Sequence, residues 1–368
     1  MNFLNQIFNS FLSNLLIYKL YRYVFIPRNI FTGAINFLSG QPTNFPLTIN
    51  FLITLKCNYV CRMCVSTLKR SNDCVPIQSM DLLTIKNFIG SIRKFQSVVH
   101  FSGGEPFMCK DFNDILACIK QNGLKCMLTT NGSLLHGDSL ISALKYVDIL
   151  IVSLYGTREI HDQVVGITGA FDRTIENLKR LIKNKRTGMR IMVSCIPLPE
   201  NIASLPSLFV DLRLIGVDSI KIEQFNFMTP AEYARSIPFI VNGLDLKPEI
   251  FLLEKNLPEG FINKVLHLRR LLQYADLPVY MKPHLTDEQM RDWYSDNPLR
   301  KNHCRFISHS VFINHNGDIL PCQFLTCCVF GNIRKDSLEV IWHSKSYQQF
   351  RKMIKEEPLK VCGRCCKS

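Results

Sequence analysis

The segment INFLITLKCNYVCRMC, Ile49–Cys64, joins an apolar run to three closely spaced cysteines. The apolar run is typical of a buried strand. Cys57, Cys61 and Cys64 follow it with the spacing C-x3-C-x2-C. A structural zinc site wants four protein ligands, and no fourth cysteine or histidine lies at a similar local spacing. Three thiolates can instead bind three irons of a cubane cluster and leave the fourth iron open to a small molecule.

Composition predicts a large globular chain in a reducing compartment. The chain has 368 residues, of which 47% are hydrophobic, which is enough for a full core. Its 15 cysteines are an odd number in a long chain, and the first basic residue is Lys19, so we expect neither a disulfide framework nor a secretory signal. We therefore expect a cytoplasmic protein whose clustered cysteines bind metal or do redox chemistry.

The formal net charge is +14. Such a charge predicts an anionic partner, which nucleic acid, a membrane surface or a phosphorylated substrate would each satisfy. The alternative is a solvated basic surface without a specific partner. No recognisable nucleic-acid-binding module accompanies the charge, which argues against nucleic acid.

From residue 46 to 225, short apolar runs alternate with segments of helical periodicity. The predicted strands are 49–55, 97–101, 125–130, 148–154, 190–196 and 219–225, and the predicted helices are 80–95, 110–123, 137–147, 171–184 and 204–216. Ser79 and Asp111 are expected N-caps, and Gly123 and Gly216 are expected helix stops. This alternation predicts an α/β fold with a parallel sheet. Six units are too few for a closed eight-stranded barrel, so we expect a partial (βα)6 TIM-type barrel with its site at the carboxyl ends of the strands.

Three regions flank this barrel. Residues 1–45 contain an amphipathic helical pattern followed by the basic residues Lys19 and Arg28. The pattern is too polar to span a bilayer. It predicts either a peripheral helix on the inner face of the membrane or a helix packed against protein. Residues 226–300 are expected to form a connecting region or lid, and residues 301–368 a small cysteine-rich α+β domain.

Four further segments give the cysteine triplet a known context. They are FSGGEP (Phe101–Pro106), TTNG (Thr129–Gly132), VSLYG (Val152–Gly156) and HDQVVGITGAF (His161–Phe171), and they lie at or after the second to fourth strands. Alone, GGEP or TTNG is typical of a turn. In this order and with the triplet, they resemble the signature of radical S-adenosylmethionine (SAM) enzymes, from about residue 46 onward.

The resemblance implies a cofactor site. Cys57, Cys61 and Cys64 would hold a [4Fe–4S] cluster whose open iron binds SAM. The implied SAM-binding residues are Ser102, Gly103, Gly104, Glu105, Asn131 and Ser153. The backbone carbonyls of the first two and the Glu105 carboxylate would accept the SAM amino group, and Ser153 would reach the ribose or the methionine part. The glycines would allow a close backbone approach to the cofactor.

Two positions depart from the family pattern. Met63 stands where an aromatic residue usually precedes the third cysteine, and it is an adaptable apolar substitute. Val165 stands where the family often has arginine, which leaves the partner of the SAM carboxylate unassigned.

The C-terminal cysteines form a second set. They make two pairs, which are Cys304 with Cys322 and Cys362 with Cys365. Four residues separate Gly317 from Cys322, and the segment VFINHNGDIL around this glycine predicts a hairpin. By spacing alone they suit a zinc ribbon. Beside the core described above, they resemble the auxiliary-cluster domain called SPASM or, in its shorter form, twitch. That resemblance implies one auxiliary [4Fe–4S] cluster, with zinc as the alternative.

The remaining cysteines are expected to be either spare or structural. Cys327, Cys328 and Cys366 are spare, and any of them could replace an implied ligand. Cys74, Cys109, Cys118, Cys126 and Cys195 are expected to be small apolar residues, with Cys195 also placed to face the cavity.

The resemblance implies an oxidoreductase or modifying enzyme. An external flavodoxin- or ferredoxin-like donor would reduce the cluster, SAM would be cleaved to a 5′-deoxyadenosyl radical, and the radical would take a hydrogen atom from a small, peptide or lipid-linked substrate. The radical leaves little need for a protein acid or base, so no catalytic acid or base is predicted. The alternatives are a non-catalytic iron–sulfur or zinc-binding docking protein and an RNA-modifying radical SAM enzyme.

Overall fold

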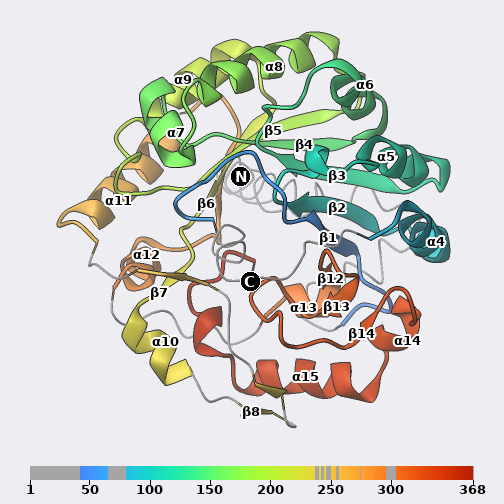
Figure 1. Ribbon diagram of the computed structural model, residues 1–368. Helices are drawn as coiled ribbons and strands as arrows, with labels where there is room; N and C mark the ends of the chain where they lie inside the picture. Colours follow the sequence, from blue (N-terminus) through green and yellow to red (C-terminus); the bar gives the residue numbers. More distant parts are fainter. Residues whose placement is uncertain are drawn as a thin grey trace, which may run out of the picture.

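A single ten-stranded sheet organises the chain, with strand order β11-β6-β5-β4-β3-β2-β1-β12-β13-β14. The structure is a computed structural model that describes residues 42–64, 80–236, 240–241, 244–245, 250–253, 257–273, 275–295 and 304–367. The expected N-terminal helix falls almost entirely on residues 1–41, so it lies outside the described residues. Helices cover the outer face of the curved sheet, and the C-terminal elements lie against its other side (Figure 1).

The six predicted barrel strands are present and in order. They are β1 (Thr48–Thr54), β2 (Val98–Gly103), β3 (Lys125–Thr130), β4 (Ile149–Ser153), β5 (Arg190–Cys195) and β6 (Ser219–Glu223). Each pairs in parallel with the next. The intervening helices are α4 (Leu82–Ile92), η1 (Arg93–Phe95), η2 (Pro106–Met108), α5 (Phe112–Gln121), α6 (Gly137–Tyr146), α7 (Arg158–Val165), α8 (Ala170–Asn184) and α9 (Leu205–Ile215). The predicted α/β fold class is confirmed.

The helix ends follow local capping chemistry. Gly216 ends α9 with a φ of 90°, and Asp111 takes the N-cap position of α5, both as expected. The N-cap of α4 is Asp81, whose carboxylate accepts hydrogen bonds from the backbone and side chain of Thr84 at 2.8 and 2.7 Å. The expected cap Ser79 lies outside the described residues.

Two further parallel strands extend the sheet beyond the six predicted units. β11 (Val279–Lys282) pairs with β6, and β12 (Ser310–Ile313) pairs with β1. The region expected to be a connector or lid therefore supplies a strand of the same sheet. The predicted hairpin is confirmed, because β12 pairs antiparallel with β13 (Asp318–Leu320), which continues to β14 (Gly331–Asn332).

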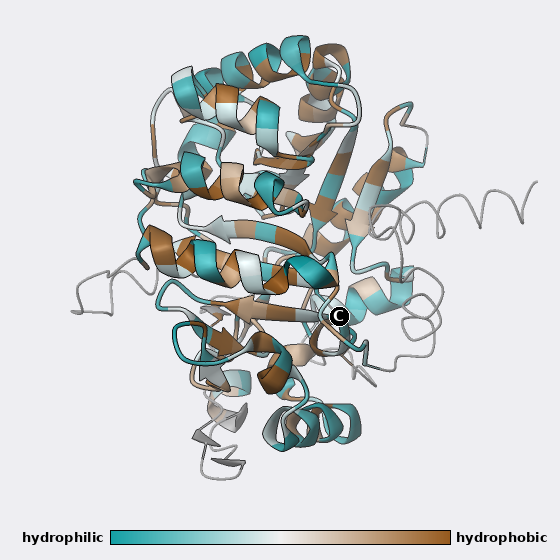
Figure 2. Cartoon of the chain, turned by 90° about the vertical axis from the view of Figure 1, so that its right-hand side faces the viewer, coloured by the Kyte–Doolittle hydropathy of each residue, from teal (hydrophilic) through white to brown (hydrophobic). Residues whose placement is uncertain are grey.

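The two faces of the sheet differ in chemistry. On β1, Ile49, Phe51 and Ile53 pack into the main core beneath the outer helices. The alternate residues Asn50 and Leu52 point to the inner face, because successive side chains of a strand alternate. Figure 2 shows the strands mostly in hydrophobic colours and the outer helices with hydrophilic faces toward solvent. The inner face of the sheet is therefore available for polar side chains.

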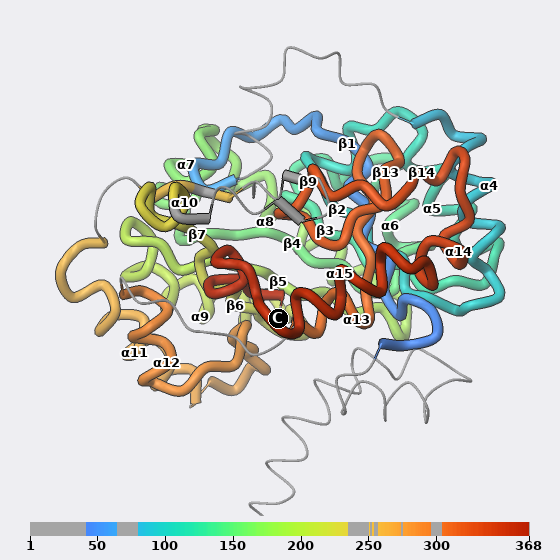
Figure 3. Tube along the Cα trace, turned by 90° about the horizontal axis from the view of Figure 1, so that it is seen from below, coloured from blue at the N-terminus to red at the C-terminus, as the bar shows by residue number. Residues whose placement is uncertain are grey.

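A second, smaller core holds the C-terminal region together. It includes residues of α13 (Phe306–His309), α15 (Lys345–Glu356) and η3 (Lys360–Cys362), whereas the buried residues of α14 (Leu338–Trp342) pack in the main core. The Arg351 guanidinium lies 3.8 Å from the Trp342 ring centre and donates to the Ile307 carbonyl at 3.1 Å, which ties α15 to α13. α15 lies in the lower part of the molecule in Figure 1, above β8, and faces the viewer in Figure 3.

The remaining described elements follow β6 in the chain and precede α13. They are β7 (Phe227–Met228), α10 (Pro230–Ser236), β8 (Ile240–Val241), β9 (Leu244–Asp245), β10 (Phe251–Leu252), α11 (Phe261–Leu272) and α12 (Asp287–Trp293). None of the helices in the described residues has the length and apolar character that crossing a membrane requires.

The loop after β2 packs directly on the loop after β1. The Gly104 N–H donates to the Thr54 carbonyl and the Glu105 N–H donates to the Lys56 carbonyl, each at 2.7 Å. Gly103 has a φ of 138°, a region that other residues rarely adopt. A Cβ at Gly103 would overlap the Thr54 carbonyl oxygen, and a Cβ at Gly104 would overlap that of Lys56. The two glycines are therefore needed for contact between the two loops.

We expect Gly104→Ala to destabilise the protein and loosen the loop before Cys57. The added methyl group meets rigid backbone, so the cost should be about 1–3 kcal/mol. The matched control is Gly90→Ala in α4, where a Cβ meets nothing within 4 Å and should stabilise by about 0.5–1 kcal/mol. Anaerobic calorimetric melting of the two variants measures the difference, and equal melting temperatures would contradict the packing described.

Candidate functional site

The three-cysteine loop lies at the carboxyl end of β1 and is anchored to α7. The Val60 N–H donates to the Val165 carbonyl at 3.0 Å, and the Arg62 N–H donates to the Val164 carbonyl at 3.2 Å. The Val165 side chain is fully buried with Tyr59 and Ala170 beneath the loop. The position at which the family often has arginine therefore supports the loop from below. Met63 is likewise buried in the main core.

Hydrogen-bond donors approach the first cysteine of this loop. The Tyr59 N–H lies 3.4 Å from the Cys57 sulfur, and the Asn131 side-chain amide lies 4.0 Å from it. Asn131 also donates to Asn58 at 2.9 Å and accepts from the Ser133 hydroxyl at 2.7 Å. These bonds hold Asn131, a predicted cofactor-binding residue, at the end of β3 beside the cysteines.

Cys57, Cys61 and Cys64 are each partly exposed in this loop. Accessible thiols with N–H donors close to one sulfur are the donor set that an iron–sulfur cluster requires, since hydrogen bonds to sulfur stabilise the bound thiolate. The residues present therefore fit the implied cluster.

Glu105 is enclosed by the loop to which it belongs. Its carboxylate accepts from the Thr130 hydroxyl and the Asn131 N–H, each at 2.8 Å, and from the Phe107 N–H at 3.3 Å. Burial raises its pKa to about 7, although these hydrogen bonds act in the opposite direction. The side chain has no exposed surface, so it links the loops after β2 and β3. Ser102 and Gly103, at the end of β2, are partly exposed, whereas Glu105 is not.

Ser153 ends β4 next to a partly buried tyrosine that the sequence did not single out. Tyr155 hydrogen-bonds to Ser153, and its pKa is raised first by burial and then by the Cys61 thiol nearby. The Tyr155 N–H donates to His161 Nδ1 at 3.1 Å, and the two rings stack with centres 6.0 Å apart. Their location within VSLYG and HDQVVG was the available signal.

A polar triad crosses the inner face of three neighbouring strands. His100 Nδ1 lies 3.0 Å from Asn50 Oδ1, and His100 Nε2 lies 2.9 Å from the Thr129 hydroxyl. Polar residues at alternate positions of otherwise apolar strands were the signal for this arrangement.

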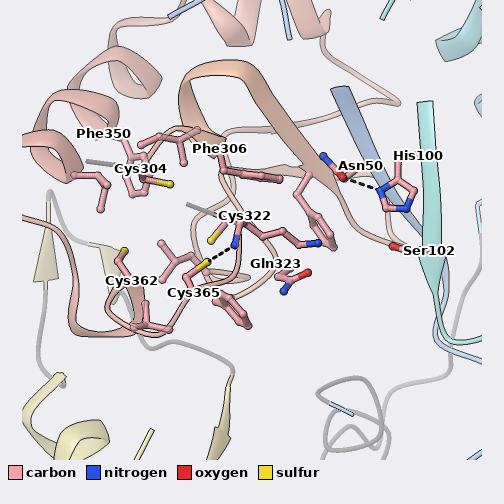
Figure 4. Close-up of a pocket in the computed structure, with 17 residues that line it drawn as sticks. Asn50, His100, Ser102, Cys304, Phe306, Cys322, Gln323, Phe350, Cys362 and Cys365 are labelled. Carbon is pink, nitrogen blue, oxygen red and sulfur yellow. Dashed lines mark hydrogen bonds between the residues drawn. The ribbon is translucent and has the colours of Figure 1, made fainter. Parts of the chain in front are cut away.

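The four cysteines implied by the auxiliary-domain resemblance line one pocket. Cys304, Cys322, Cys362 and Cys365 surround the same space, with Phe306 and Phe350 beside them (Figure 4). Burial raises the pKa of Cys322 and of Cys362, and the neighbouring thiols raise both further. Four neighbouring, largely enclosed thiols that oppose one another's ionisation are stabilised as thiolates when iron binds. This donor set fits an auxiliary cluster.

The other cysteines take different positions. Cys118, Cys126 and Cys195 are buried in the main core, and Cys109 packs against it, as expected for apolar residues. The Cys195 side chain lies beneath the helices, so the expectation that it could face the cavity is not met. Cys74 lies outside the described residues.

The spare cysteines are not among the residues that line the pocket of the four. Cys327 is exposed beside Cys328, while Cys366 accepts from the Asn226 amide at 3.2 Å. Among the described residues, no three His, Cys, Asp or Glu side chains are grouped so as to hold a single metal ion.

The same pocket is lined by residues of the barrel and of the C-terminal domain. It is lined by Asn50, His100 and Ser102 from the barrel as well as by the four C-terminal cysteines, and Figure 4 shows His100 and Ser102 across the cavity from Cys322. The inner face of the barrel therefore opens toward the C-terminal cysteines.

Comparison with known families agrees with this arrangement. The Radical SAM superfamily matches residues 51–208, and SPASM, an iron-sulfur cluster-binding domain, matches residues 304–366. The chain carries a radical SAM domain followed by a SPASM domain. These domains imply a [4Fe–4S] cluster with SAM in the barrel and auxiliary iron–sulfur binding at the C-terminus, which sets the zinc alternative aside.

Related proteins align with this chain over most of its length. The AdoMet-dependent heme synthase of Methanosarcina barkeri is 24% identical over 88% of this chain and 89% of its own. The tungsten-containing aldehyde ferredoxin oxidoreductase cofactor-modifying protein of Pyrococcus furiosus is 25% identical over 85% of each chain. The crystal structure of Streptococcus suis SuiB bound to S-adenosylmethionine superposes with a TM-score of 0.61 at 17% identity, covering 97% of this chain and 84% of SuiB, which shows a shared fold.

Buried His161 should make the stability of this site depend on pH. Burial lowers its pKa from 6.5 to about 4, so the folded protein stays unprotonated at His161 where the unfolded chain binds a proton. The contribution of neutral His161 to the free energy of unfolding is complete above pH 6.5. The free energy of unfolding should therefore decrease by about 1 kcal/mol between pH 7.5 and 5.5.

His161→Asn is the matched variant for this prediction. An asparagine oxygen can accept from the Tyr155 N–H in place of Nδ1 without titrating. Melting temperatures of the anaerobic protein should therefore fall less on acidification in His161→Asn than in the wild type. Parallel decreases in the two proteins would mean that another group is responsible.

The auxiliary ligand set predicts a specific loss of iron. Cys304→Ala and Cys362→Ala should each lower the iron content of the reconstituted protein from about eight to about four per chain, because a four-thiolate cluster loses one ligand. Cys327→Ala, on an exposed neighbour, should keep all of it. Iron loss in Cys327→Ala together with full iron content in Cys304→Ala would mean that Cys327, and not Cys304, is the ligand.

Proposed function

We propose that this protein is a radical SAM enzyme that abstracts a hydrogen atom from a substrate held inside the barrel. The observation that carries the proposal is the single pocket shared by the inner barrel face and the C-terminal cysteines. When bound, the cluster and SAM supply one-electron cleavage of the sulfonium to methionine and a 5′-deoxyadenosyl radical, which removes the hydrogen atom.

The residues of this chain bind and orient. Cys57, Cys61 and Cys64 hold the cluster over the carboxyl ends of the strands. The carbonyls of Ser102 and Gly103 accept the SAM amino group, while Gly104 and Glu105 keep that loop against β1.

Two further residues complete the proposed SAM site. Asn131 donates toward Cys57, and Ser153 binds the ribose or the methionine part. Tyr155 and the apolar residues around it exclude water from the same region.

The auxiliary site has a role in electron transfer or in substrate anchoring. Cys304, Cys322, Cys362 and Cys365 lie across the pocket from His100, so a substrate between them would contact both sides. We place one auxiliary [4Fe–4S] cluster there. Its apolar surroundings would slow solvent access and set its potential.

The partners are an electron donor and an organic substrate. Radical SAM enzymes need a reductant, and a flavodoxin- or ferredoxin-like protein fits the basic net charge of +14. The relatives act on varied molecules, as their names show: a heme synthase and a cofactor-modifying protein. SuiB has been crystallised with its precursor peptide SuiA. A small, peptide or lipid-linked substrate is proposed for this chain.

The anaerobic, cluster-loaded protein should convert SAM to 5′-deoxyadenosine and methionine when dithionite is added. Cys61→Ala and Cys64→Ala should lower the yield at least a hundredfold, because two thiolates hold the open cluster poorly. Cys118→Ala, in the main core, should keep the yield within about twofold, since this side chain packs away from the pocket. Chromatography of the products measures the yield. A loaded wild-type protein that forms no 5′-deoxyadenosine would refute the proposal.

A further inference from the structure

Charged residues occupy the inner face of the barrel where β6 and β11 end. Lys221 and Glu223 alternate with Ile220 and Ile222, which pack in the main core, so the charged pair points inward. Lys282 lies opposite Glu223 in the parallel register of β11 with β6. The side chains of Lys221 and Glu223 are only 13% and 19% exposed. Enclosed lysines are costly to keep unless their charge is used.

A third lysine reaches this point from the end of the chain. Lys367 Nζ lies 3.6 Å from Glu223 Oε1, and Lys221 Nζ lies 3.2 Å from the same oxygen. Lys367 also lines the pocket that contains His100 and Ser102. Three ammonium groups from separate parts of the chain therefore meet at the end of one strand.

Three lysines and the Glu223 carboxylate come together at this point. Glu223 already interacts with two lysines, and although burial raises its pKa, Lys221 and Lys367 lower it to about 2. The pKa of Lys282 is lowered to about 8, first by burial and next by the nearby Lys367 ammonium. Ammonium groups that repel one another in a partly dry cavity are stabilised by an anion placed between them.

The lysines lie in the part of the barrel in which a substrate would bind. In the parallel register Lys221 lies opposite Ser194, and Ser194 lies opposite Ser153 of the proposed SAM site. On the other side, Cys366, the neighbour of auxiliary Cys365, lies 4.0 Å from Glu223. The charged group therefore lies between the proposed SAM site and the C-terminal cysteines.

We infer that Lys221, Lys282 and Lys367 form a subsite that binds an anionic group of the substrate, a carboxylate or a phosphate. Glu223 holds Lys221 and Lys367 in place by ion pairs, and Lys367 lines the pocket at the inner barrel face. The inference rests on the proposed function, because it names the chemistry of the molecule that enters the same pocket. A lysine subsite of this kind would fix the substrate at one end and leave its other end toward the three-cysteine loop.

Equilibrium binding to the anaerobic, cluster-loaded protein tests the subsite without turnover. Isothermal titration would compare glutarate, its uncharged counterpart glutaramide, and inorganic phosphate. We expect glutarate or phosphate to bind at least tenfold more tightly than glutaramide. The tighter of the two anions identifies the group. Lys221→Met and Lys282→Met should each weaken anion binding at least fivefold and leave glutaramide unchanged.

Two control variants separate charge from folding. Lys282→Arg keeps the positive charge and should retain anion binding within about twofold. Lys179→Met removes an exposed lysine of α8 on the outer surface and should have no effect. Anion binding no tighter than that of glutaramide, or unaffected in both methionine variants, would overturn the inference.

Two other roles for the lysines give different results. If they bind the SAM carboxylate, the methionine variants would weaken SAM binding and spare glutarate. If they only offset the charge of the auxiliary cluster, the variants would shift its reduction potential with anion affinity unchanged. Either result would overturn the inference. Anion binding without 5′-deoxyadenosine formation would instead refute the proposed function, so the two failures are distinguishable.

Discussion

The backbone contact between the loops after β1 and β2 is the constraint on which the site depends. The Thr54 and Lys56 carbonyls accept hydrogen bonds from the N–H groups of Gly104 and Glu105. The two loops approach each other too closely for a side chain at Gly103 or Gly104. This contact places the cysteine loop over the carboxyl ends of the strands. Glu105 then extends the same framework to β3 through Thr130 and Asn131. Rigid backbone, rather than flexible side chains, therefore orients the three thiols.

The two faces of the barrel strands have different roles: one forms the stabilising core, and the other lines the site. Residues such as Ile49 and Phe51 face the helices and form the core, while Asn50, His100 and Thr129 face inward and bond to one another. The C-terminal region joins the same sheet through β12, so its cysteines meet the pocket from the open side. A substrate enclosed there would be shielded from water, which protects a reactive radical from side reactions.

Much of this arrangement was predictable from short-range patterns. The six barrel strands and the hairpin around Gly317 follow from residue alternation and turn chemistry, and the structure confirms them. β11 was missed because its four residues carry a weak local pattern, and its pairing partner β6 ends more than 50 residues earlier. The inward lysines were missed for the same reason: Lys221, Lys282 and Lys367 become neighbours only when the strands and the end of the chain are assembled.

The sequence by itself determined the order of strands and helices, the spacing of both cysteine sets and the family resemblance, because each depends on residues close together in the chain. Tertiary structure alone decided that Glu105 is enclosed, that Cys195 lies beneath the helices, and that the barrel pocket reaches Cys322. Those outcomes depend on strand register and on contacts between distant segments. A change of one residue in register would turn every inward side chain outward, and no local pattern specifies that register fully.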